Sequence, residues 1–167
     1  MTETPNITSL LDLDLNSVDI SFPIIKAGIY DMVIKESFVA NNKASDGKNW
    51  VYKLATTTPT DGIKGEKFDI GHIVTSQLSL KTKSEKKTED QMKEIIVKNA
   101  ARILQAIKPP VTGITGKDLF DGSFETKCKA LQGRMIRVKL DALPERRDKD
   151  SGKTLPPTND IAQFIKT

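Results

Sequence analysis

Apolar and polar residues alternate along several stretches of this chain, with the two-residue period of half-buried β-strands. Each stretch is rich in β-branched or aromatic residues, which favour strands. The stretches are Gly28–Ala40, Asn49–Thr57, Glu66–Leu80, Arg134–Leu143 and Asn159–Lys166. Turn-forming residues, including Asp46 and Gly47, separate the first two. The pattern therefore predicts five strands.

A helical pattern interrupts the strands after the third one. Apolar residues recur at three- or four-residue spacing over Glu89–Lys108, as on the buried face of an amphipathic helix. Thr88 and Gln91 have the spacing of a capping box, and Pro109 follows the pattern as a stop signal. The sequence thus predicts a helix over Glu89–Lys108. It also indicates a shorter helix over Phe124–Leu131.

Three strands, a helix and two strands form the element order of the OB-fold, a five-stranded barrel that binds oligonucleotides or oligosaccharides. We therefore expect a mainly β protein, built as a five-stranded OB-fold-like barrel with one α-helix between the third and fourth strands. In this fold the loops after the first and fourth strands commonly clamp the ligand. Those loops are Asn41–Lys48 and Pro144–Pro157. Because a fold alone does not define a function, the function has to be inferred from individual residues.

Charge is distributed unevenly along the chain. The formal net charge is +4, but residues 1–25 contain four of the 22 acidic residues and none of the 26 basic ones, which leaves +8 on the remainder. This asymmetry divides the chain into an acidic N-terminal arm (1–25) and an OB-fold-like domain (26–167). A basic body favours an anionic polymer as partner. Within the arm, Leu10–Leu15 alternates apolar and acidic residues, which suits either an edge-pairing strand or a short amphipathic helix.

Signatures of catalysis are missing from the sequence. His72 is the only histidine and Cys128 the only cysteine, so neither a histidine pair nor a CxxC zinc motif can form. Phosphate-binding glycine loops and serine nucleophile motifs are also absent. We therefore predict a protein that is not an enzyme and that uses no metal and no cofactor. We expect His72 and Cys128 to be structural residues.

The sequence contains no apolar stretch of the length needed to cross a membrane, so no membrane association is expected. A single cysteine excludes an internal disulfide and fits a reducing compartment.

Two aromatic residues on the second strand are candidates for base stacking. Trp50 and Tyr52 point to the same face, and an exposed aromatic side chain can stack on a nucleobase. Leu54 shares that face, however, so both rings could instead lie in the core. In that case Lys53 faces outward and becomes the contact. Phe68 on the third strand could extend a stacking platform.

Basic side chains on the fourth strand and in the loop after it are candidates for phosphate contacts. Arg137 and Lys139 alternate with apolar residues, so they should point to solvent about 6–7 Å apart, a spacing that suits an extended strand of phosphates. Arg134 begins the same strand. The following loop contributes Arg146, Arg147 and Lys153, although nearby acidic residues reduce its net charge. Lysines within 81–87 form a second basic cluster.

The chain resembles the small single-stranded DNA-binding proteins of tailed bacteriophages over about residues 10–165. The similarity lies in six segments: Leu10–Leu15, Lys26–Tyr30, Asp46–Trp50, Lys64–Phe68, Leu131–Lys139 and Asn159–Phe164. The resemblance implies an OB-fold protein in the host cytoplasm that coats single strands during phage DNA replication or recombination. It also implies a homo-oligomer, often a dimer, with an acidic tail that recruits replication proteins. The C-terminus of this chain is not acidic, so the acidic N-terminal arm is the candidate for that role.

Together these features predict a sequence-independent single-stranded DNA-binding protein that neutralises phosphates and stacks bases. RNA is an alternative polymer. The competing hypothesis is a structural or assembly protein, such as a virion component, built on a similar barrel and using its arm to pair with a neighbouring sheet.

Overall fold

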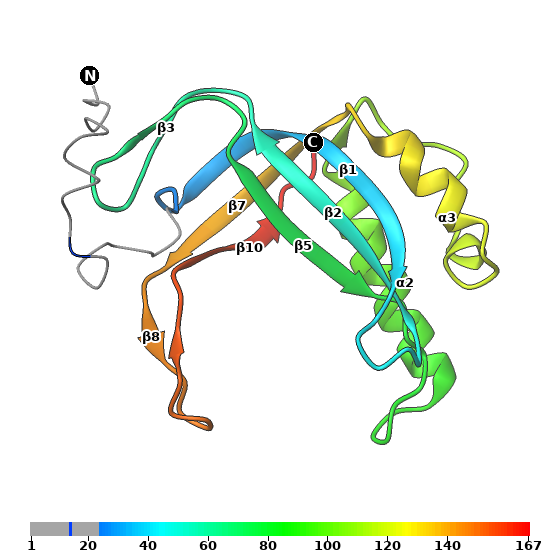
Figure 1. The fold of residues 1–167 in the computed structure, drawn as a ribbon. Helices are drawn as coiled ribbons and strands as arrows, with labels where there is room; N and C mark the ends of the chain where they lie inside the picture. Colours follow the sequence, from blue (N-terminus) through cyan, green and yellow to red (C-terminus); the bar gives the residue numbers. More distant parts are fainter. Residues whose placement is uncertain (1–13, 15–23) are drawn as a thin grey trace.

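The computed structural model describes Asp14 and residues 24–167. The protein is mainly β, and its centre is one large antiparallel sheet that arches over a helix (Figure 1). The mainly β class predicted from the sequence is confirmed. The predicted acidic arm lies almost entirely outside the described residues, whereas Ile24 and Ile25 are buried in the described domain.

Five long strands form the sheet: β1 (Gly28–Asn41), β2 (Lys48–Thr56), β5 (Ile73–Ser79), β7 (Met135–Leu143) and β10 (Thr158–Phe164). They lie in the order β10–β7–β1–β2–β5, and every neighbouring pair is antiparallel. The short strand β6 (Ile107–Lys108) also pairs with β7. Two hairpins stand apart from this sheet: β3 (Thr60–Asp61) with β4 (Lys67–Phe68), and β8 (Arg146–Arg147) with β9 (Thr154–Leu155).

The predicted helix is α2 (Glu89–Gln105), which begins with the expected capping box. The Gln91 N–H donates to Thr88 Oγ1 at 3.2 Å, and the Thr88 N–H donates to Gln91 Oε1 at 3.0 Å. The helix ends earlier than predicted because the next residues become β6 and pair with β7 ahead of the prolines. Three shorter helical segments follow: η2 (Gly116–Leu119), α3 (Phe124–Lys127) and η3 (Cys128–Leu131). The last two confirm the second helical region.

The core lies between the inner face of the sheet and α2. Strand β7 contributes Ile136, Val138 and Leu140, all buried as their spacing predicted. From α2, Ile96, Ala100 and Ile103 pack against the sheet. A register shift between Ile34 and Glu36 allows β1 to bend while it pairs with both β2 and β7, because a bulge increases local twist.

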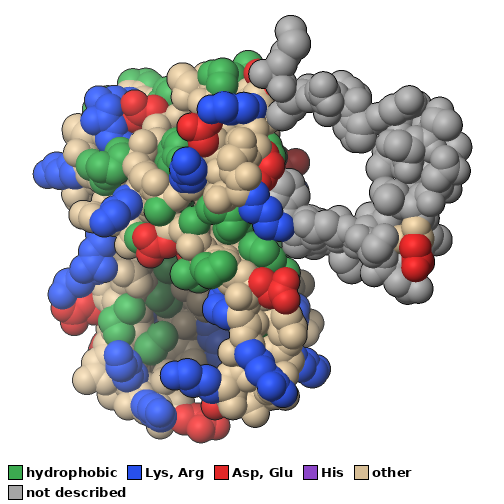
Figure 2. Space-filling model, turned by 90° about the vertical axis from the view of Figure 1, so that its left-hand side faces the viewer, with side chains coloured by type: hydrophobic (Ala, Val, Ile, Leu, Met, Phe, Trp, Pro, Cys, Tyr) green, Lys and Arg blue, Asp and Glu red, His purple; other side chains and the backbone are tan. Residues whose placement is uncertain are grey.

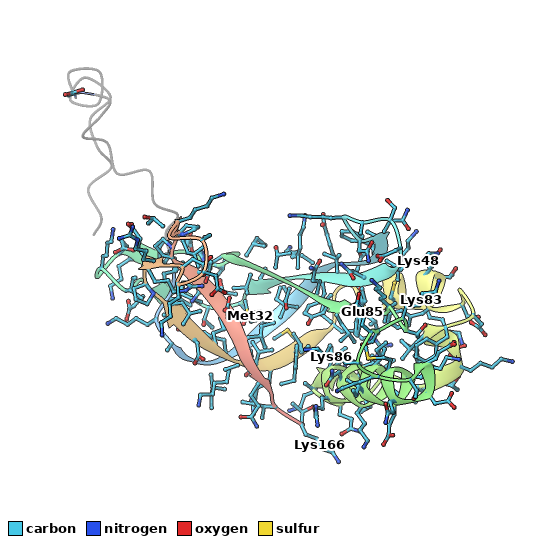
Figure 3. All side chains as sticks on the ribbon, turned by 90° about the horizontal axis from the view of Figure 1, so that it is seen from below. Met32, Lys48, Lys83, Glu85, Lys86 and Lys166 are labelled. Atoms are coloured by element: carbon cyan, nitrogen blue, oxygen red, sulfur yellow. The ribbon has the colours of Figure 1, made fainter. Side chains whose placement is uncertain are left out.

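The closed barrel predicted from the sequence is not formed. Strands β5 and β10 are the two ends of the sheet and share no ladder. Seen from below, the green β5 and the red β10 diverge from one end (Figure 3). Side chains connect the two edges instead. The ring of Tyr52 on β2 lies 6.1 Å from that of Phe164 on β10. His72, just before β5, forms a side-chain hydrogen bond with Asn159 of β10.

The prediction of a single third strand over Glu66–Leu80 is also wrong. The chain turns between Phe68 and Ile73, where Gly71 has a φ of +93°, a conformation that glycine adopts without strain. As a result, β4 leaves the sheet to pair with β3. The extra short strands place α2 between β5 and β6 rather than between a third and a fourth strand, and α2 is not the only helix.

Candidate nucleic-acid interface

The aromatic pair on β2 lies in the core and not on a binding face. Trp50 is 1% exposed and Tyr52 is 4% exposed. The Trp50 Nε1–H donates to Ser37 Oγ at 2.9 Å, and its ring packs edge-on against Phe124 at 4.9 Å. Leu54, on the same face of β2, is fully buried. Base stacking by Trp50 or Tyr52, as the sequence suggested, is therefore wrong.

Lys53 points to the opposite, outer face of β2, as expected if the aromatic residues are inside. Its Nζ lies 2.8 Å from Glu36 Oε2, so the charge is partly balanced. Phe68 does not continue a platform beside β2, because it belongs to β4 in a separate hairpin. There its ring is half-buried, with its centroid 5.1 Å from that of His72.

Arg137 and Lys139 of β7 face solvent, as the strand period predicted. Arg137 binds the carboxylate of Asp31 through two hydrogen bonds of 2.8 and 3.1 Å. These bonds hold the pKa of Asp31 below its usual range. Lys139 is exposed and lies opposite Ile29, which is 63% exposed, on the neighbouring β1. The outer face at this point is thus basic and partly apolar.

Arg134 has a structural contact in addition to its charge. Its guanidinium donates to the carbonyl oxygens of Pro109 and Pro110, at 2.8 and 3.2 Å. These bonds hold the segment after β6 against the start of β7. The guanidinium remains half-exposed, so Arg134 still adds positive charge there.

The loop after β7 is an ordered hairpin that carries the other predicted basic residues. Arg146 and Arg147 form β8 and Lys153 precedes β9, and all three are exposed. Arg147 Nε donates to the Gly152 carbonyl at 3.1 Å, which closes the hairpin end. Asp148 accepts hydrogen bonds from Ser151, so the carboxylate of this acidic residue is held inside the hairpin. The hairpin extends from the sheet in Figure 1.

A second basic region lies where the β1–β2 turn meets the segment before α2. Lys48, Lys83, Glu85 and Lys86 lie at this end of the molecule (Figure 3). Lys81 ties the two segments together by an ion pair with Asp46 at 2.5 Å, and Lys48 pairs with Glu125. Because Lys48 and Lys81 already have acidic partners, the cluster is less basic than the sequence suggests.

A groove that the sequence did not predict lies between β5, β10 and α2, and its volume is about 540 Å³. Its lining residues are Tyr52, Gln77, Leu78, Asn99, Arg102, Ile103, Ala162, Gln163 and Phe164. A register shift between Ile161 and Gln163 places Phe164 on the inner face, opposite Val138. The three-residue spacing of Ile161 and Phe164 is the one sequence signal of this shift.

One side of the molecule combines hydrophobic and basic side chains. Figure 2 shows a hollow with hydrophobic side chains inside it and Lys and Arg side chains around its rim. Within the described residues, no cluster of three or more His, Cys, Asp or Glu side chains could hold a metal ion. No helix in that part of the chain is long and apolar enough to span a membrane.

The only cysteine and the only histidine of the chain are each at least partly buried. Cys128 is fully buried, and this burial raises the pKa of its thiol. Burial lowers the pKa of His72, and a hydrogen bond with Asn159 opposes that shift.

Comparisons with known proteins add no relative: no family model, no curated protein and no solved structure matches the chain.

Proposed function

We propose that this protein is a non-catalytic, sequence-independent single-stranded DNA-binding protein of the kind used in phage DNA replication and recombination. The strand lies against the outer face of β7 and is flanked by the β1–β2 turn and the β8–β9 hairpin. Phosphate neutralisation supplies most of the affinity. Because phosphates are common to both polymers, RNA is a second ligand of the same surface.

The order of the long elements is the observation that carries this proposal. Strands β1, β2 and β5 precede α2, and β7 and β10 follow it. We infer an OB-fold-like sheet that is open between β5 and β10, since that fold is a partly open five-stranded barrel. Its ligand-flanking loops correspond here to the β1–β2 turn and the β8–β9 hairpin.

Charge supports the same proposal. The chain after residue 25 carries a net +8, and Lys139 with the exposed Arg146 and Lys153 contributes to it. The ion pair of Arg137 with Asp31 is exposed, and such pairs are worth about 0–1 kcal/mol, so a phosphate can compete for the guanidinium. With Trp50 and Tyr52 inside, stacking on β2 plays no part.

The test of the surface is a charge-removal pair measured with a labelled 30-nucleotide dT oligomer. Lys139→Gln should weaken binding and reduce the slope of log affinity against log salt by about 0.7, the value for one phosphate contact. Lys117→Gln is the matched control, because Lys117 is also exposed but lies on η2, away from β7. Equal effects of both substitutions would contradict the proposed surface.

The second candidate function is a structural or assembly role, and the outer edge of β5 favours it. The β2–β5 ladder alternates so that the backbone groups of Thr75 and Gln77 point away from β2. β5 contains no charged residue and no proline, the usual protections of an exposed edge. A homodimer joined at this edge, or by the acidic arm, would follow. The full chain and a form lacking residues 1–23 distinguish the two functions. Loss of assembly without the arm, measured by light scattering, favours the structural role. Retained affinity for the dT oligomer, measured by anisotropy, favours DNA binding.

A further inference from the structure

The groove between β5 and β10 has an apolar floor and a polar rim. Inner-face side chains of the two strands and of α2 form the floor: Leu78, Phe164 and Ile103, beside Tyr52. Gln77 of β5 and Gln163 of β10 are exposed and also line the groove. Each precedes an inner-face residue of its strand, so its side chain leaves the outer face of the sheet at the open seam. The volume of about 540 Å³ lies within the range of small-molecule sites, about 300–1,000 Å³.

The side chains at the α2 end of the groove add an amide and a cation. Arg102 Nη1 donates to Asn99 Oδ1 at 2.8 Å, which orients the guanidinium by a neutral partner. Among residues 24–167, no carboxylate pairs with Arg102, and no acidic side chain lines the groove. The groove is therefore electropositive and free to accept an anion.

The backbone of β5 offers further hydrogen-bonding groups. In an antiparallel ladder, alternate residues direct both their N–H and C=O away from the partner strand. The bond from Leu80 N to Lys48 O fixes the phase of the β2–β5 ladder, so Thr75 and Gln77 are the residues that point toward the open seam. Had β5 and β10 paired, a barrel ladder would have used these groups.

We propose that this groove is a nucleobase pocket of the bound single strand. The half-buried ring of Phe164 stacks on a base, and Tyr52 holds that ring edge-on from behind at 6.1 Å. The amides of Gln77 and Gln163 donate to and accept from the base edge, as Gln and Asn do in base recognition. Arg102 binds the adjoining phosphate. The proposal rests on the proposed function and adds a site that the β7 surface does not include.

The composition of the lining favours a nucleobase over an extended peptide. A base presents a flat aromatic face and a mixed donor and acceptor edge next to an anionic phosphate. Those three features match Phe164, the two rim glutamines and Arg102 respectively. An apolar peptide could hydrogen-bond the amides through its backbone, but it would leave Arg102 without an anionic partner.

The experiment compares two single strands of equal length, one of dT and one with abasic sites that keep every phosphate. Anisotropy of each labelled oligomer is measured with the full chain at low salt. We expect the wild-type protein to prefer dT by about 5- to 150-fold, the range produced by one stacked base. Phe164→Leu keeps an apolar side chain against Tyr52 but removes the ring, and it should bring this preference close to one.

Two controls separate the pocket from general effects on the fold or charge. Phe120→Leu removes another half-buried aromatic ring, outside the groove, and should leave the preference for dT unchanged. Arg102→Gln should weaken both oligomers, and more than Lys98→Gln, which removes a cation one turn earlier on α2 outside the groove.

The failures of the two proposals are distinct. Equal wild-type binding of dT and abasic strands would overturn the pocket while leaving phosphate-based binding intact. The same holds if Phe164→Leu retains the full preference, which would point to a peptide or other occupant of the groove. Absence of binding to either oligomer at low salt would overturn the proposed function itself.

Discussion

Replacing Trp50 by Phe tests whether this residue serves the core or the ligand. The substitution removes the Nε1–H that donates to Ser37 Oγ, and Ser37 is 0% exposed, so its hydroxyl loses its buried partner. A buried polar group left unsatisfied costs about 1–3 kcal/mol, and the missing ring atoms leave a cavity beside Phe124. We therefore expect Trp50→Phe to lower the free energy of unfolding by about 2–4 kcal/mol.

Urea unfolding followed by far-ultraviolet circular dichroism measures this loss, because tryptophan fluorescence disappears with the substitution. Ser37→Ala completes a double-mutant cycle: it leaves the Trp50 Nε1–H without its partner, whereas the double variant removes both groups. Since both partners are then absent, the double variant should cost less than the sum of the single ones. Unchanged stability in Trp50→Phe, together with weaker binding of a dT oligomer, would refute the assignment of Trp50 to the core.

Three further predictions follow from individual contacts. Thr88→Ala removes the capping box of α2 and should lower the free energy of unfolding by about 1 kcal/mol, whereas Thr88→Ser should not; equal losses in chemical denaturation would contradict the cap. Burial lowers the pKa of His72 in the folded state, so the unfolded chain binds more protons and stability should fall as pH drops below about 6.5. The His72→Gln variant should lack this component in melts between pH 7.5 and 5.5 (about one unit either side of the unfolded pKa), and an identical pH slope in both proteins would rule the effect out. Asp31→Asn frees Arg137 from its exposed ion pair and should raise affinity for dT at low salt by up to about fivefold, measured by anisotropy; weaker binding would show that Arg137 does not face the strand.

Local patterns in the sequence predicted the elements well where the deciding interactions are also local. The capping box at Thr88 requires groups only three residues apart. The alternation in β7 placed Ile136 inside and Arg137 outside because successive side chains of a strand point to opposite faces. The parity of Trp50 was equally clear, but parity alone does not say which face is buried. The informative clue in the sequence was the apolar Leu54 on the same face, and the structure shows that residue to be fully buried.

Features that depend on distant contacts were missed. Whether β5 meets β10 depends on how α2 and the rings of Tyr52 and Phe164 fill the seam, which no local pattern encodes. The break at Gly71 was visible as a glycine, but its conversion of one strand into two required the pairing of β4 with β3. The groove residues Gln77, Asn99 and Gln163 come together only because the seam is open.

Binding of single-stranded DNA by phosphate neutralisation is best measured by titrating the wild-type protein with a labelled 30-nucleotide dT oligomer over a series of salt concentrations. We expect binding at low salt whose log affinity falls linearly with log salt, by about 0.7 for each phosphate neutralised. We also expect little direct quenching of Trp50, which is 1% exposed. No change in anisotropy at low salt, or binding that salt does not weaken, would contradict a single-stranded DNA-binding protein that works by phosphate neutralisation.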